Sequence, residues 1–120
     1  MTYKLEPFIK KADVLKVLEK VLLSSELEKS SIYWFPELVP KNTIINTGLQ
    51  LVTAPFNCVL VFIDISPHYN WAHPCIYLLV GKMEKQIVKI ESSFPPKGFY
   101  DDNSSILLMK DGKIIESDTK

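Results

Sequence analysis

The sequence lacks arginine entirely, because all 14 of its basic residues are lysines. An arginine guanidinium reads guanine edges and clamps phosphates or carboxylates with paired hydrogen bonds, whereas lysine supplies only a compact charge. The acidic residues also number 14, so the formal net charge is zero. A chain without the guanidinium fork or a basic surplus is poorly suited to nucleic acid, and we expect no nucleic-acid partner.

Long apolar runs are absent as well. The run from Cys58 to Ile63 is broken by Asp64, far short of the roughly 20 residues that a membrane helix needs. The segment Met1 to Lys11 lacks the apolar stretch of a secretory signal. We therefore expect a cytoplasmic protein with no membrane partner, in which reducing conditions keep Cys58 and Cys75 as thiols.

One segment, Asp13 to Lys29, has the apolar periodicity of a helix. This pattern predicts an N-terminal amphipathic helix with Asp13 as its N-cap. Serine is a poor residue inside a helix, so Ser24 and Ser25 predict a weak point. The apolar residues that recur at spacings of three and four are Val14, Leu15, Val17, Leu18, Val21 and Leu22.

From Ser31 onward, β-branched and aromatic residues dominate and prolines interrupt the chain, which favours strands. Asp111-Gly112 predicts a two-residue hairpin, because both central residues of a type I′ turn need positive φ. We expect one α+β domain over residues 1–120, with the N-terminal helix on one face of an antiparallel β-sheet arranged as a meander. The expected strands are Ser31 to Phe35, Thr43 to Thr53, Asn57 to Ile65, Cys75 to Gly81, Gln86 to Glu91, Ser104 to Lys110 and Lys113 to Glu116.

The most informative segment, Asn57 to Gly81, predicts a central hairpin. If its loop closes symmetrically, Asp64 faces Cys75 and Phe62 faces Tyr77. Cys58 and Cys75 are then about 20 Å apart along the strands, too far for a disulfide. Alternation gives one aliphatic face for the helix, made of Val59, Val61, Ile63, Ile65, Ile76, Leu78 and Val80. The second face carries Leu60, Phe62, Asp64, Cys75 and Tyr77, with His73 next along and His68 and Trp71 in the loop.

A catalytic interpretation of the second face makes Cys75 a nucleophile, His73 its base and Asp64 the group that orients the base. Residues 73 and 75 lie side by side on one strand, however, and no glycine-rich turn or helix N-terminus follows Cys75 to form an oxyanion hole. The geometry therefore counts against a thiol hydrolase.

A metal-binding interpretation uses His68, His73 and Cys75, with Asp64 as a fourth ligand, but the spacing H-x4-H-x-C matches no common zinc module. The favoured interpretation is structural: Asp64 caps the loop, His73 bonds a carbonyl and Cys75 packs as a small apolar residue. We expect neither a metal nor another cofactor.

Aromatic residues outside the hairpin are further candidates for binding. In Tyr33-Trp34-Phe35, alternation sends Trp34 and its neighbours to opposite faces, so at least one set belongs to the core. The connection Ser92 to Asn103 is longer than usual, and its aromatic residues would either close over the second face as a lid or simply pack there. These residues are Phe94, Phe99 and Tyr100.

A hairpin that is apolar on both faces needs two covers, and the sequence offers one convincing helix. We therefore expect a non-catalytic binding or regulatory module whose second sheet face, near His68, Trp71 and Tyr77, contacts a protein partner or a second copy of the chain. The alternatives are a metal- or thiol-dependent hydrolase at Asp64, His73 and Cys75, and a small-ligand pocket under residues 92–103.

Overall fold

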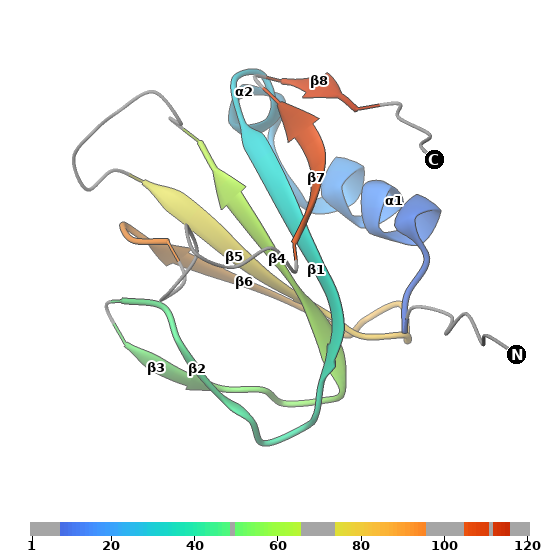
Figure 1. The fold of residues 1–120 in the computed structure, drawn as a ribbon, viewed down its shortest axis with the longest axis vertical. Helices are drawn as coiled ribbons and strands as arrows, with labels where there is room; N and C mark the ends of the chain where they lie inside the picture. The colour runs from blue at the N-terminus through green and yellow to red at the C-terminus, as the bar shows by residue number, and fades with distance from the viewer. Residues whose placement is uncertain (1–7, 49, 66–73, 96–104, 111, 116–120) are drawn as a thin grey trace, which may run out of the picture.

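The computed structural model describes residues 8–48, 50–65, 74–95, 105–110 and 112–115. Within these residues the helices precede the strands (Figure 1). The elements are α1 (Lys11–Val21), α2 (Ser24–Leu27), β1 (Ser31–Val39), β2 (Ile44–Asn46), β3 (Leu51–Thr53), β4 (Cys58–Asp64), β5 (Cys75–Val80), β6 (Ile87–Ser92), β7 (Ile106–Lys110) and β8 (Lys113–Ile114).

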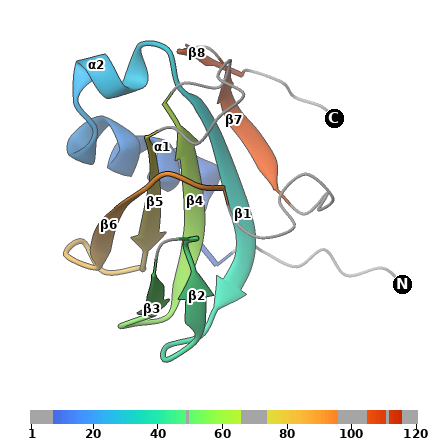
Figure 2. The same ribbon diagram turned by 90° about the vertical axis from the view of Figure 1, so that its left-hand side faces the viewer.

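Six strands form one antiparallel sheet in the order β6-β5-β4-β1-β7-β8, and β2 and β3 pair separately (Figures 1 and 2). The fold is therefore α+β. Only β4, β5 and β6 follow one another as in a meander. β1 lies between β4 and β7, because the chain leaves β1 through the β2–β3 hairpin, returns beside it as β4, and later adds β7 to its other edge.

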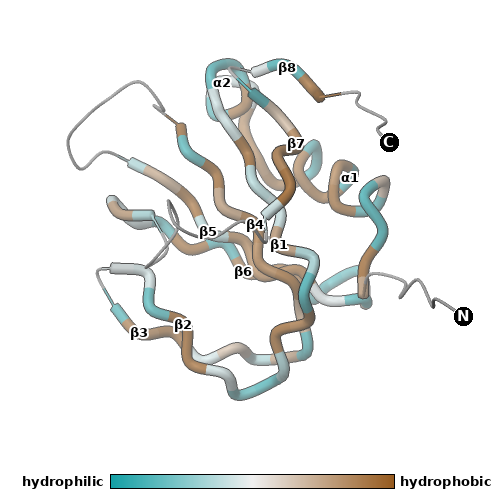
Figure 3. The backbone as a smooth tube through the Cα atoms, viewed as in Figure 1, coloured by the Kyte–Doolittle hydropathy of each residue, from teal (hydrophilic) through white to brown (hydrophobic). Residues whose placement is uncertain are grey.

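α1 covers one face of the sheet, where Val14, Leu18 and Leu22 are buried. They pack in one core with the aliphatic face expected for β4 and β5, which includes Val61 and Leu78. Figure 3 shows apolar stretches of β1, β4 and β5 gathered at the centre of the molecule. No helix in the described residues is long and apolar enough to cross a membrane.

The helical region differs from the expectation at both ends. α1 begins after Lys10, which makes no side-chain cap, so the prediction of Asp13 as N-cap is wrong. Asp13 instead lies in the first turn, where its negative charge interacts favourably with the positive end of the helix dipole. α1 stops at Val21 because Leu22 has an extended backbone, and Ser24 begins a separate short helix.

The segment Thr43 to Thr53, predicted as one strand, is a hairpin in which Ile45 pairs with Val52. Its turn contains Gly48 with φ of +89°, a conformation that other residues rarely adopt. Ile45 and Val52 pack on the second face of the sheet. In Figure 1 this hairpin and α1 lie on opposite sides of the sheet. The second face therefore has a cover from the same chain, and the premise that a single helix must shield the sheet is wrong.

The register of the central hairpin is as predicted. Asp64 pairs with Cys75 and Phe62 with Tyr77. Cys58 and Cys75 are both free thiols. The alternation with a period of two determines which side chains share a face, because a shift by one residue would move every side chain to the other side.

Candidate functional site

Cys75 lies at the centre of the sequence-predicted site. It pairs across the sheet with Asp64 on β4 and with Ser92 on β6. Cys75 is only 3% exposed, and its thiol donates a hydrogen bond to the carbonyl oxygen of Phe94 at 3.3 Å. The structure thus brings Asp64, Cys75 and Phe94 into one neighbourhood.

The electrostatic surroundings of Cys75 oppose ionisation. Burial, followed by the nearby charge of Asp64, raises the pKa of the Cys75 thiol to about 11, and hydrogen bonds to Ser92 and Phe94 offset this only in part. A nucleophilic cysteine needs the reverse, a thiol whose pKa is lowered toward neutrality by a positive neighbour. At neutral pH Cys75 is a protonated, buried group, which favours the structural interpretation.

Tyr77 shares its acceptor with Cys75. Its hydroxyl donates to the same carbonyl oxygen of Phe94 at 2.8 Å, and its ring meets Phe62 edge to face with centroids 5.4 Å apart. Burial, followed by the neighbouring Cys75, raises the pKa of Tyr77. The two donors hold the backbone of the chain after β6 beside the second face, while the Phe94 side chain is 40% exposed.

The turn of the β2–β3 hairpin contacts the same segment of the chain, at Ser92 and Phe94. The Ser92 hydroxyl donates a hydrogen bond to the carbonyl oxygen of Thr47 at 2.6 Å. The hairpin backbone lies so close to Phe94 that a Cβ atom added to Gly48 would be 2.6 Å from the Cβ atom of Phe94. Beside them a hollow of about 270 Å³ is lined by Asn46, Gly48, Phe94 and Pro95. It is smaller than the usual 300–1,000 Å³ of sites for drug-sized ligands.

Several predicted site residues lie outside the described residues. These are His68, Trp71, His73, Phe99 and Tyr100. The proposed triad and the proposed zinc ligands therefore each include residues that lie outside the described part of the chain. Within the described part of the chain, no group of three His, Cys, Asp or Glu side chains is placed to hold a metal ion.

Trp34 takes a structural position. It is 4% exposed and lies in the core beneath α1, while Tyr33 and Phe35 pack on the second face, as strand alternation predicts. Its indole N–H finds no acceptor among the described residues. Buried in this way, Trp34 offers no surface to a partner.

A larger concave surface lies elsewhere, and sequence reasoning missed it. This surface, the α1 groove, has a volume of about 750 Å³ and lies between α1 and the turn that joins β5 to β6. Three of its lysines lie at positions 10, 16 and 20, at the start of α1 and along it, a spacing that is visible in the sequence. Its lining is Phe8, Ile9, Lys10, Asp13, Lys16, Val17, Lys20, Val80, Gly81, Lys82, Met83, Glu84 and Ile87.

The α1 groove is basic at its rim and apolar at its floor. Four lysines face two carboxylates, although the whole chain carries no net charge. Lys20 pairs with Glu84 at 3.6 Å, and the Lys82 ammonium lies 4.8 Å from the centre of the Phe8 ring. Within the described residues, Lys10 and Lys16 form no ion pair, so their charges are available to a ligand.

The second cavity near Cys75 has the opposite character. It measures about 530 Å³ and carries two carboxylates and no basic residue. Its lining is Glu26, Ile65, Pro74, Cys75, Ile76, Glu91, Ser92 and Ser93.

Compared with models of known protein families, with curated proteins and with solved structures, the chain has no match.

Proposed function

We propose that this protein is a non-catalytic binding module that holds an acidic, partly apolar peptide segment of another protein in the α1 groove. The observation that carries the proposal is the combination of four lysines at the rim with an apolar floor. The class of function is the one expected from the sequence. The surface is different, because the second sheet face is covered by the chain itself.

The shape of the groove suits a short extended segment. Lys10 and Lys20 are ten residues apart, which corresponds to about 15 Å along the helix. An extended peptide of four to five residues spans about the same length. Alternate side chains of such a peptide point in opposite directions, so apolar residues can contact Val17 and Met83 while carboxylates meet the lysines.

The chemistry of the rim favours carboxylates on a peptide over a free phosphate. Lysine ammonium groups act as mobile point charges, whereas tight recognition of one phosphate usually combines an arginine fork or several backbone N–H groups. The chain has no arginine. Charges spread along a segment are a better match for lysines spread along α1.

The test uses two short fluorescent peptides, one of alternating Glu and Leu and one of alternating Lys and Leu, in an anisotropy titration. We expect the acidic peptide to bind and its affinity to fall with added salt. Lys16→Glu should weaken binding roughly three- to tenfold, because it removes one attraction and adds one repulsion at a partly exposed site.

The matched control is Lys113→Glu, which makes the same charge change at an exposed position of β8. Equal effects of Lys16→Glu and Lys113→Glu would show that only overall charge matters and would contradict the proposal. So would equal binding of the basic peptide, or competition by inorganic phosphate at the same concentration as the acidic peptide, which would point to a free anion instead.

A cytoplasmic location remains part of this proposal. Two free thiols, both buried, support a reducing compartment. The hydrolase alternative at Asp64, His73 and Cys75 has less support, because the raised pKa of Cys75 keeps the sulfur protonated at neutral pH. The pocket alternative under residues 92–103 is weakened by the hydrogen bonds that hold Phe94 against the sheet.

A further inference from the structure

The two edges of the six-stranded sheet differ in how they are protected. At one end, β8 contains only two residues. At the other end, β6 contains six residues and no proline, and no described strand pairs with its outer edge. Short edge strands, prolines and outward charges are the usual defences against edge-to-edge pairing. β6 lacks the first two.

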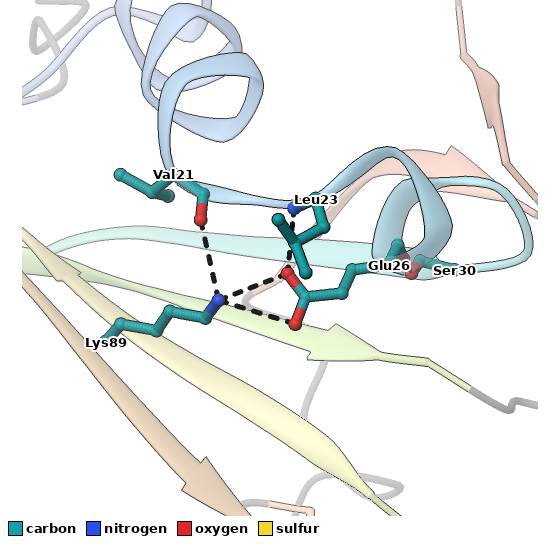
Figure 4. A network of polar contacts seen from close by, with 5 residues as sticks. All are labelled: Val21, Leu23, Glu26, Ser30 and Lys89. Carbon is teal, nitrogen blue, oxygen red and sulfur yellow. Dashed lines mark hydrogen bonds and ion pairs between the residues drawn. The ribbon is translucent and has the colours of Figure 1, made fainter.

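One of the two charged side chains of β6, Lys89, is engaged within the molecule. The Lys89 ammonium lies 3.1 Å from a carboxylate oxygen of Glu26 and 3.5 Å from the carbonyl oxygen of Val21 (Figure 4). Burial alone would raise the pKa of Glu26, but the Leu23 N–H and Lys89 outweigh it and lower the pKa, so the carboxylate stays charged. Glu26 thus offsets part of the charge of Lys89.

We propose that β6 pairs with β6 of a second copy of this chain, forming an antiparallel dimer with one continuous sheet. The two copies would be related by a two-fold axis perpendicular to the sheet, which keeps each side chain on its own face. Residues that face each other across the two strands must then lie on the same face, so the axis passes beside one residue, which pairs with its own copy. If it is centred on Ile90, Lys89 of each copy faces Glu91 of the other. If it is centred on Lys89 or on Glu91, two like charges face each other.

Among these three registers, cross-strand charge favours the one centred on Ile90, because opposite charges directly across a pair stabilise it and like charges destabilise it. Glu91 is exposed and has no ion-pair partner among the described residues, so it is available to the second copy. Val88 and Ile90 on the other face add β-branched contacts that suit strand pairing.

An exposed apolar side chain beside this edge supports the same partner. Leu23 is 65% exposed and precedes α2, where its N–H donates to the Glu26 carboxylate that holds Lys89. Figure 4 shows Leu23 and Lys89 around the same carboxylate. A second copy lying along β6 would shield this leucine from water.

The experiment compares the oligomeric state of the full chain and its variants by sedimentation velocity at micromolar concentration. We expect the wild type to be a dimer and Glu91→Lys to weaken the dimer by at least roughly tenfold, since two attractive pairs become repulsive. Glu37→Lys is the matched control, because Glu37 is an exposed residue of β1 away from this edge. Lys16→Glu in the α1 groove should also leave the dimer intact.

A mixing experiment identifies the register. Lys89→Glu and Glu91→Lys should each fail to self-associate, but an equimolar mixture should form a heterodimer because every cross-strand pair is then of opposite sign. Hydrogen exchange of the β6 amides in the wild type, which should slow with rising protein concentration, gives a readout that does not depend on the folding of a variant. A wild-type monomer, or a dimer insensitive to Glu91→Lys, would overturn the proposal.

Discussion

The reactivity of the two thiols separates a structural role of Cys75 from a catalytic one. With a pKa of about 11, roughly one Cys75 side chain in a thousand is a thiolate at pH 8. A free cysteine with a pKa of about 8.5 is about one-quarter thiolate at that pH. Ionisation alone should therefore slow alkylation of Cys75 about 200-fold relative to a free cysteine, and burial should slow it further.

The assay is alkylation by iodoacetamide at pH 8, followed by mass spectrometry of the peptides that contain Cys58 and Cys75. Burial also raises the pKa of Cys58, so we expect both thiols to be slow in the folded protein and fast after denaturation. A Cys75 that reacts faster than a free cysteine, or whose rate rises through a midpoint below pH 8.5, would contradict a structural role for this thiol and revive the hydrolase hypothesis.

The same shift has a consequence for stability. Below about pH 8.5 both the folded and the unfolded chain keep the Cys75 proton, so the thiol adds no pH dependence. Between about pH 8.5 and 10 the unfolded thiol loses its proton and the folded one retains it, so stability should fall with rising pH by up to about 1.4 kcal/mol per unit. Urea unfolding across this range should show a shallower decline for Cys75→Ala than for the wild type.

Two further substitutions test the local structure. Gly112 has φ of +83°, and an added Cβ would lie 1.9 Å from the Glu28 carbonyl oxygen, so Gly112→Ala should cost more than about 2 kcal/mol and lower the melting temperature by roughly 10 °C. Glu26→Gln should cost about 0.5–1 kcal/mol at pH 7. Because the pKa of Glu26 is lowered by folding, its contribution is present above the ordinary glutamate pKa of about 4.3 and is lost as the pH falls below it, so this difference should shrink on acidification, as measured by chemical denaturation.

The sequence was informative where periodicity and turn chemistry agree. The facing of Asp64 and Cys75 followed from two alternating runs around one loop, and the opposite placement of Trp34 and Tyr33 followed from the period of two. The hairpin at Gly112 followed from the need for positive φ. In each case the determining interaction is local, so a single sequence contains the relevant information.

The errors arose where one signal was overlooked or where the outcome depends on distant contacts. Gly48 marked a turn inside the apolar stretch 43–53, and reading that stretch as one strand removed the second cover of the sheet. The α1 groove could not be predicted in the same way. Its lysines come from α1 and from the turn after β5, and only the folded chain brings Lys16 near Lys82.

The two proposed surfaces also depend on each other through symmetry. Since α1 and the β2–β3 hairpin cover the two faces of the sheet, both proposals use its periphery: the groove containing Met83 and the edge near Leu23. A two-fold axis perpendicular to the sheet would place both α1 grooves on the same side of the joined sheet. A partner with two acidic segments would then gain effective concentration from the dimer, provided that its linker spans the two grooves. Glu91→Lys would reduce the affinity for such a partner while leaving the affinity for a single segment unchanged, and this difference separates the role of the edge from that of the groove.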